Sequence, residues 1–241
     1  MRPNPKKIIE IIGITTPLIG FYDAPDVSKF KPIVAPEPGK HICVFSFYEK
    51  WLTGETLHIT KDNFGCGGAA KYLCSTEIMP RENHVQFLVD GEGLKASHDL
   101  MNQWLDHNNP YRPEHSNILI GPLRDDQYEY LKSVSFYVNP DQLSALMLGA
   151  EYNKSPNDPP AVIAPFGSGC MQLVTLFEDL NIPQAVIGAT DIAARQFLPP
   201  DILAFTVTKP MLKQLCELDE KSFLYKPFWK NLREARGLIQ D

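Results

Sequence analysis

Short apolar segments rich in β-branched and aromatic residues recur along the whole chain, and helical patterns separate most of them. The segments predict strands at 18–22, 41–47, 55–59, 85–89, 118–122, 133–138, 161–166, 184–189 and 203–207. The patterns between them predict helices at 5–12, 64–74, 97–107, 140–150, 170–180, 191–197 and 209–217, and a closing helix follows Lys221. Several strands are almost continuously apolar, which is typical of strands buried on both faces. Strands that alternate with helices predict an α/β layered fold.

Two parts of the chain share an ordered set of features. Residues 119–143 and 186–212 each begin with an apolar strand that ends in glycine. Each continues through a short polar helix to a strand with the spacing Phe-x-Val, and then to a proline near the start of a helix. We interpret this as an internal duplication, with strand–helix–strand–helix halves related by a pseudo-twofold. Chance similarity between two ordinary stretches of this kind is the alternative.

The duplication predicts a single compact domain over residues 1–241. Its first half covers about 17–150 with an insertion at about 75–117, a linker lies at 153–160, and the second half covers about 161–241. The linker is predicted from the segment NKSPNDPP, because its proline, asparagine and aspartate residues favour neither a helix nor a central strand.

Each predicted half contains a glycine-rich turn with a cysteine, FGCGG around Cys66 and FGSGC ending at Cys170. Both turns follow a predicted strand and precede a predicted helix. The unpaired amides of a helix N-terminus favour a thiolate, which predicts a lowered pKa for both cysteines. The glycines remove side chains that would block a ligand, and Ser168 can cap the second helix.

We predict that both turns face one shared pocket. Cys66 and Cys170 are the candidate metal ligands or catalytic residues. The candidate ligand-binding residues are Gly65, Gly67, Gly68, Gly167, Ser168, Gly169, Asp191 and Arg195. Asp191 and Arg195 stand four residues apart, a spacing that suits either a substrate carboxylate bound by the arginine or a surface ion pair. The simpler interpretation of the turns is that the glycines only permit tight geometry and the cysteines fill space.

The other three cysteines are predicted to lie outside the site. Cys43 falls in an apolar strand and Cys216 in a late helix, and free cysteine is among the most buried residue types. Cys74 follows Cys66 by eight residues, which is roughly 12 Å along a straight helix, so the two cannot easily bind one ion.

Three functions fit this pattern, and the identity of any cofactor stays unknown. In the first, which we rank highest, the cysteines bind a small molecule or a metal-type cofactor, with an iron–sulfur cluster as one candidate. A cluster needs more than two thiolates, so a homo-oligomer or Cys74 would supply the others. The second function is a cysteine-dependent enzyme acting on a small anionic substrate. The third is an anion-binding module without chemistry.

Charge and hydrophobicity exclude two classes of partner. The formal net charge is −6 and no run of four basic residues occurs, which predicts no nucleic-acid binding. No stretch approaches the roughly 18 apolar residues of a membrane span, which predicts no membrane partner. The basic N-terminus is similar to a secretion signal, but Glu10 and Pro17 interrupt its apolar run, so a cytoplasmic protein is expected. Its five cysteines are then expected to be free thiols.

Two common cofactor motifs are also disfavoured. The histidines show no H-E-x-x-H spacing and the cysteines no C-x-x-C spacing, which argues against a mononuclear zinc site. Gly91 and Gly93 follow a predicted strand, as in a dinucleotide-binding turn. However, Asp90 and Glu92 stand where the pyrophosphate would bind, and their charges would repel it.

The sequence resembles the uncharacterised family called domain of unknown function 169. The resemblance covers nearly the whole chain and is carried by the segments TPLIGFY, FGCGGA, NILIGPL, VSFYVNPDQLSAL, VIAPFGSGC and VIGATDIAAR. Its most specific parts are the cysteine turns and the stretch that contains Gly188, Asp191 and Arg195. The family has no established activity, so the resemblance implies a single cytoplasmic fold and no reaction.

Overall fold

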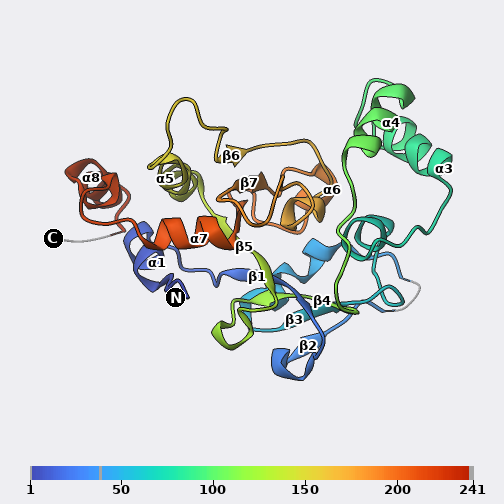
Figure 1. Ribbon diagram of the computed structural model, residues 1–241, viewed down its shortest axis with the longest axis horizontal. Helices are drawn as coiled ribbons and strands as arrows, with labels where there is room; N and C mark the ends of the chain where they lie inside the picture. Colours follow the sequence, from blue (N-terminus) through green and yellow to red (C-terminus); the bar gives the residue numbers. More distant parts are fainter. Residues whose placement is uncertain (1, 38–39, 239–241) are drawn as a thin grey trace.

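Eight strands form one mixed sheet in the computed structural model, which describes residues 2–37 and 40–238 (Figure 1). The strands are β1 (Ile19–Ala24), β2 (Ile33–Val34), β3 (Thr56–Ile59), β4 (Asn117–Pro122), β5 (Leu131–Val138), β6 (Val162–Ile163), β7 (Ala185–Gly188) and β8 (Leu203–Thr208). Helices pack on the sheet, so the predicted α/β class is confirmed at that level.

The strand order is β2-β3-β4-β1-β5-β8-β7-β6. The pairs β2–β3 and β6–β7 at the two edges are parallel, and all other neighbours are antiparallel. Strands β1 to β4 make up one side of the sheet and β5 to β8 the other. From the centre of the sheet outwards, the order is β1-β4-β3-β2 on one side and β5-β8-β7-β6 on the other. Within each set of four, the first strand is therefore followed by the fourth, the third and the second.

The predicted equivalence of 119–143 and 186–212 is wrong in space. β4 and β5 lie on opposite sides of β1 and do not pair with each other. β7 and β8, by contrast, are antiparallel neighbours. The two stretches share the same order of local elements. However, β1 lies between β4 and β5, whereas no strand lies between β7 and β8. Local sequence similarity carries no information about such a long-range insertion.

Two predicted strands are helical. In 85–89, the buried residues Val85 and Leu88 are three apart. This spacing places them on one face of a helix, and the segment belongs to α3 (Arg81–Gln86) and the π-helical turn after it. Residues 44–47 form a 3₁₀ turn that leads into α2 (Tyr48–Leu52). The predicted helix at 170–180 is also wrong, because only 171–173 are helical there.

The remaining α-helices begin or end at residues that favour helix termini. They are α1 (Lys6–Ile12), α4 (His98–His107), α5 (Pro140–Glu151), α6 (Ile192–Arg195), α7 (Lys209–Cys216) and α8 (Pro227–Ala235). Asn139 and Gln142 form a reciprocal capping box at the start of α5. Gly13 ends α1 with a φ of 79°, a conformation that glycine adopts without steric cost. Among the described residues, no helix has both the length and the apolar character needed to cross a bilayer.

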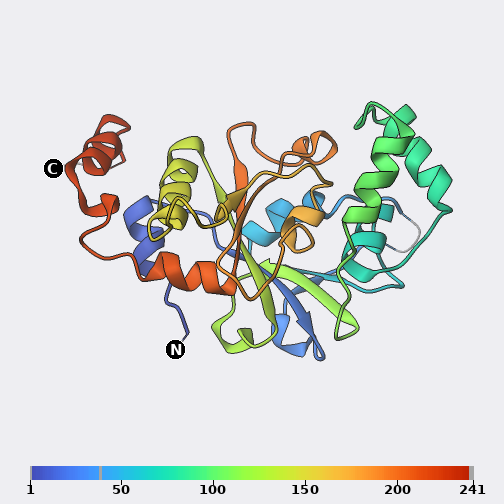
Figure 2. The ribbon, with the colours of Figure 1, turned by 45° about the horizontal axis from the view of Figure 1, so that its top comes forward.

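Side chains alternate along each strand, so the sheet presents two faces. A hydrophobic core covers each face, which buries the sheet on both sides. Leu119 packs with α1, α5 and α7 in one core. Ile118 and Ile120 face the other core, which contains α2 and the two cysteine turns. Figures 1 and 2 place α3 and α4 at the opposite end of the molecule from α1 and α8. Because the cysteine turns belong to the core that contains α2, they lie on the face of the sheet away from α1, α5 and α7.

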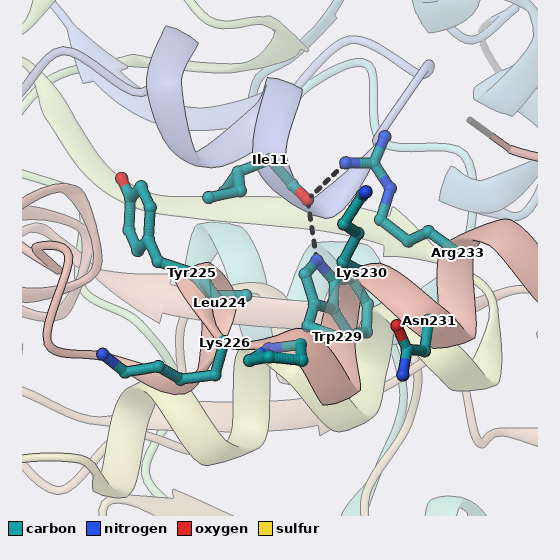
Figure 3. A pocket seen from close by; sticks show the side chains of 9 residues that line it. Ile11, Leu224, Tyr225, Lys226, Trp229, Lys230, Asn231 and Arg233 are labelled. Carbon is teal, nitrogen blue, oxygen red and sulfur yellow. Dashed lines mark hydrogen bonds between the residues drawn. The ribbon is translucent and has the colours of Figure 1, made fainter. Parts of the chain in front are cut away.

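The closing helix α8 is held on α1 by hydrogen bonds to one carbonyl group. The indole Nε1 of Trp229 donates to the carbonyl oxygen of Ile11 at 2.8 Å, and Nη1 of Arg233 donates to the same oxygen at 3.0 Å (Figure 3). This oxygen lies in the last turn of α1, where a helix has no internal donor left. Trp229 therefore satisfies a backbone acceptor that the helix itself leaves without a donor.

Candidate functional site

A cavity of about 480 Å³ lies between the two cysteine turns. Gly67 and Gly68 of the first turn and Ser168 and Gly169 of the second line it. Three thiols also line it: Cys43, Cys66 and Cys170. Cys74 and Cys216 are not part of the lining.

Gly68 lies between the two turns, close to a sulfur of each. A methyl group placed there would lie 3.5 Å from Sγ of Cys170 and 3.8 Å from Sγ of Cys66. The two sulfurs are therefore no further apart than the sum of these distances. Residues far apart in the sequence thus share one cavity.

The turns meet over one face of the sheet and not at one edge. Five successive antiparallel pairings separate β3 from β7, and β7 is parallel to β6. β3 precedes the first turn and β6 precedes the second. They therefore run in opposite directions, and their carboxyl ends lie at opposite edges. The two turns are therefore not brought together by a common edge of the sheet. Both turns instead fold back over the same core, to which Ala69 and Cys170 belong.

Cys43 belongs to the site, although its sequence context predicted an inert core residue. It precedes the 3₁₀ turn at 44–47, just as Cys170 precedes the one at 171–173. The amide of Ile42 donates to the carbonyl of Gly65 at 2.7 Å, which holds this segment against the first turn. A methyl group at Gly65 would lie 2.4 Å from the carbonyl oxygen of Ile42, so this approach requires glycine.

Burial raises the pKa of all three thiols. The pKa of Cys43 is raised to about 11, that of Cys66 is raised, and that of Cys170 is raised well above its ordinary value. Neighbouring thiols add to this effect for Cys43 and Cys170. The amide of Ala69 does donate to Sγ of Cys66 at 3.3 Å, as a helix start should. Desolvation outweighs that bond, so the predicted lowering of the pKa is wrong.

Asp191 organises the second turn and the start of α6. Its Oδ2 accepts from the amide of Gly169 at 2.8 Å, and its Oδ1 accepts from the amide of Ala193 at 2.9 Å. The residue lines the cavity, as predicted for a ligand-binding position. Ser168 makes no side-chain cap on the helical turn at 171–173, so that part of the prediction is wrong.

Arg195 does not line the cavity. Its guanidinium donates to the carbonyl oxygens of Ile202, Pro199 and Pro200 and thereby closes the loop after α6. Neither predicted role, a substrate carboxylate or an ion pair with Asp191, matches these contacts. Gly65 and Gly167 also lie outside the lining. A methyl group on Gly167 would lie 3.0 Å from Leu176, so this glycine serves packing.

The predicted insertion at 75–117 supplies one wall of the cavity. Its lining residues are Ile78, Met79, His84, Phe87, Leu88 and Glu92. The hydroxyl of Tyr72 lies 3.3 Å from Nε2 of His84. Burial lowers the pKa of His84, whereas burial and then the charge of Asp191 raise the pKa of Glu92. Sequence reasoning missed these residues because no local motif marks them.

The donor atoms of the site do not converge on one point. Within residues 2–37 and 40–238, no three His, Cys, Asp or Glu side chains are placed to hold a single metal ion. The cavity therefore offers thiols, carboxylates and imidazoles distributed around a volume.

The family model for domain of unknown function 169, described as uncharacterised ArCR, matches residues 7–217. The chain belongs to this family. The match confirms the resemblance and contains every residue that lines the cavity, whereas α8 lies beyond it. No curated protein and no solved structure matches this member of the ArCR family.

Proposed function

We propose that the cavity binds a small cofactor or ligand through Cys43, Cys66 and Cys170. The observation that carries the proposal is the position of Gly68, whose missing side chain leaves space between the sulfurs of Cys66 and Cys170. Thiols in an otherwise apolar core pack well without such a space. A concave site with a few converging polar groups is the usual form of a ligand pocket.

The chemistry of the donors favours a thiophilic group. Thiolates are soft ligands that prefer iron–sulfur clusters and soft metal ions. A bound positive group would offset the cost of ionising three thiols, one buried and two partly buried, that lie near one another and near Asp191. Because no three donors meet at a point, a cluster suits the site better than a mononuclear ion. Further thiolates for a cluster would come from a second copy of the chain.

The nucleophile hypothesis has less support. A cysteine nucleophile acts as the thiolate, and burial raises the pKa of every thiol in the cavity. A bound positive group would change this, but it would also occupy the sulfurs. Binding of a cofactor or ligand therefore remains our first choice, as it was from the sequence.

We infer that the site lies between two similar halves of the chain, β1 to β4 and β5 to β8. The same strand order and the same pairing directions on each side of the sheet support this inference. With the halves defined in this way, the boundary between them falls between β4 and β5. The segment 153–160 is then a connection within the second half. A pseudo-twofold perpendicular to the sheet, between β1 and β5, would carry the site face onto itself.

This division of the chain changes which residues occupy equivalent positions in the two halves. Cys43 corresponds to Cys170, because each precedes a 3₁₀ turn between the second and third strands of its half. Cys66 corresponds to Asp191, because each accepts a backbone amide at the helical turn after the third strand. The proposed site is then two pairs of equivalent positions, three occupied by thiols and one by a carboxylate.

Anaerobic purification with an absorption spectrum, metal analysis and sulfide analysis tests the proposal. We expect a bound group that is lost in Cys66→Ser and Cys170→Ser and retained in Cys216→Ser, whose thiol lies outside the cavity. Native mass spectrometry detects a metal-free organic ligand in the same samples. A protein with the mass of the chain alone, which also takes up no iron and sulfide on reconstitution, would contradict the proposal.

A further inference from the structure

The side chains of the cavity that carry a full charge at neutral pH are acidic. Glu92 and Asp191 line it, and within the described part of the chain no lysine or arginine does. The remaining titratable groups are the three thiols, Tyr72, His41 and His84. Burial lowers the pKa of His84, which keeps it neutral at and above neutral pH. The cavity is therefore a site of negative potential.

Three backbone amides of the turns and of α6 that could hold an anion already have acceptors within the chain. The amides of Gly169 and Ala193 donate to the carboxylate of Asp191 at 2.8 and 2.9 Å. The amide of Ala69 donates to the sulfur of Cys66 at 3.3 Å. An anionic ligand would have to displace these acceptors and then lie beside a carboxylate, which repels it.

The rest of the lining is largely apolar and reaches the surface. Phe87, Ile78 and Met79 line the cavity and are 54%, 43% and 37% exposed. Phe45 and Tyr72 are buried and form part of its inner wall. Large apolar side chains are rarely left exposed beside a cavity unless they contact a partner or a ligand.

We propose that the cavity selects a ligand with a positively charged group and an apolar or aromatic body. The cation lies near Glu92 and Asp191, and the body packs against the aromatic wall and the rim formed by Ile78, Met79 and Phe87. This inference rests on the proposed function, because it assigns a charge and a shape to the ligand of the same cavity. It replaces the anionic substrate and the anion-binding module expected from the glycine turns.

Three probes that share one apolar body test the charge preference: phenylbutylamine, phenylbutanol and phenylbutyrate. They are titrated by calorimetry into metal-free protein at low salt and about pH 8, where the amine is charged. We expect the amine to bind at least about tenfold more tightly than the carboxylate, with the alcohol between them. Added salt should reduce the difference.

The variant Glu92→Gln should reduce the preference for the amine by about threefold or more, because it removes one charge and keeps the shape. Glu82→Gln, an exposed carboxylate of α3 outside the lining, is the matched control and should leave the preference unchanged. Equal affinities, tighter binding of the carboxylate, or no binding by any probe would overturn the inference. The titration uses no metal, so its failure is distinguishable from failure of the cofactor analysis.

Discussion

Gly68→Ala separates a structural role of the first turn from a binding role. Gly68 has φ −63° and ψ −46°, a helical conformation that alanine adopts readily. The added methyl group would lie 3.5 Å from Sγ of Cys170, 3.8 Å from Sγ of Cys66 and 3.8 Å from Cδ2 of Tyr72. These are ordinary van der Waals contacts, so no atom has to move.

The substitution should therefore leave the folded protein as stable as before or more so. Replacing glycine by alanine in a helical conformation stabilises a protein by roughly 0.5–1 kcal/mol. For a chain of this size that corresponds to an increase of about 1–4 °C in the melting temperature. If the turn were only structural, the variant would be a neutral or improved protein in every assay.

Binding should respond in the opposite direction. The methyl group would occupy the space between the sulfurs of Cys66 and Cys170, so a group that contacts both must be displaced. We expect the affinity for the bound group to fall at least about tenfold, equivalent to about 1.4 kcal/mol. The assay compares thermal melting with the amount of group bound after anaerobic reconstitution.

Gly91→Ala is the matched control. Gly91 ends the π-helical turn at 87–91, and its added methyl group would lie 3.4 Å from the nearest atom, Cδ2 of Phe87. It does not line the cavity, so binding should not change. Undiminished binding by Gly68→Ala would refute the placement of the ligand between the sulfurs. A loss of stability of more than about 1 kcal/mol would refute the packing argument.

Three further predictions concern Cys43 and Gly65, the glycine that holds its segment against the first turn. Alkylation of Cys43 should accelerate about tenfold per pH unit up to about pH 11, because its pKa is raised to about 11; a plateau near pH 9 in mass-spectrometric labelling would contradict this. The same shift should weaken the folded state between about pH 9 and pH 11, where only the unfolded chain releases this proton. Gly65→Ala should destabilise the protein by about 2 kcal/mol or more in chemical denaturation, because its methyl group would clash with the backbone of Ile42; unchanged stability would show that the segment can move away.

Local patterns determined much of the secondary structure. Gly13 ends the first helix, and Asn139 with Pro140 begins another, because caps depend only on residues within one turn. The strands at the centre of the sheet were predictable from their β-branched and aromatic content. The two glycine turns could be singled out for the same reason, since a cysteine among glycines after a strand is visible in a few residues.

The same local patterns failed where burial decided between alternatives. The segments at 41–47 and 85–89 have the composition of strands. However, 85–89 buries Val85 and Leu88 with helical spacing, and residues 44–47 form a 3₁₀ turn. Which face of such a segment is buried depends on what packs against it. The prediction for Cys43 was wrong for this reason. The neighbouring amide of Ile42 bonds to Gly65, a residue distant in the sequence, and this contact places Cys43 beside the cavity.

Only the tertiary structure decided the composition and chemistry of the site. The strand order, which comes from long-range pairing, separates β4 from β5. Under the pseudo-twofold that we propose, Cys66 is then the counterpart of Asp191 rather than of Cys170. The insertion closes one side of the cavity and places Glu92 in the lining. The pKa of each thiol reflects desolvation by everything that covers it, which exceeds the local effect of a helix start. A sequence specifies which groups stand at a turn, but their environment exists only once distant segments have packed around them.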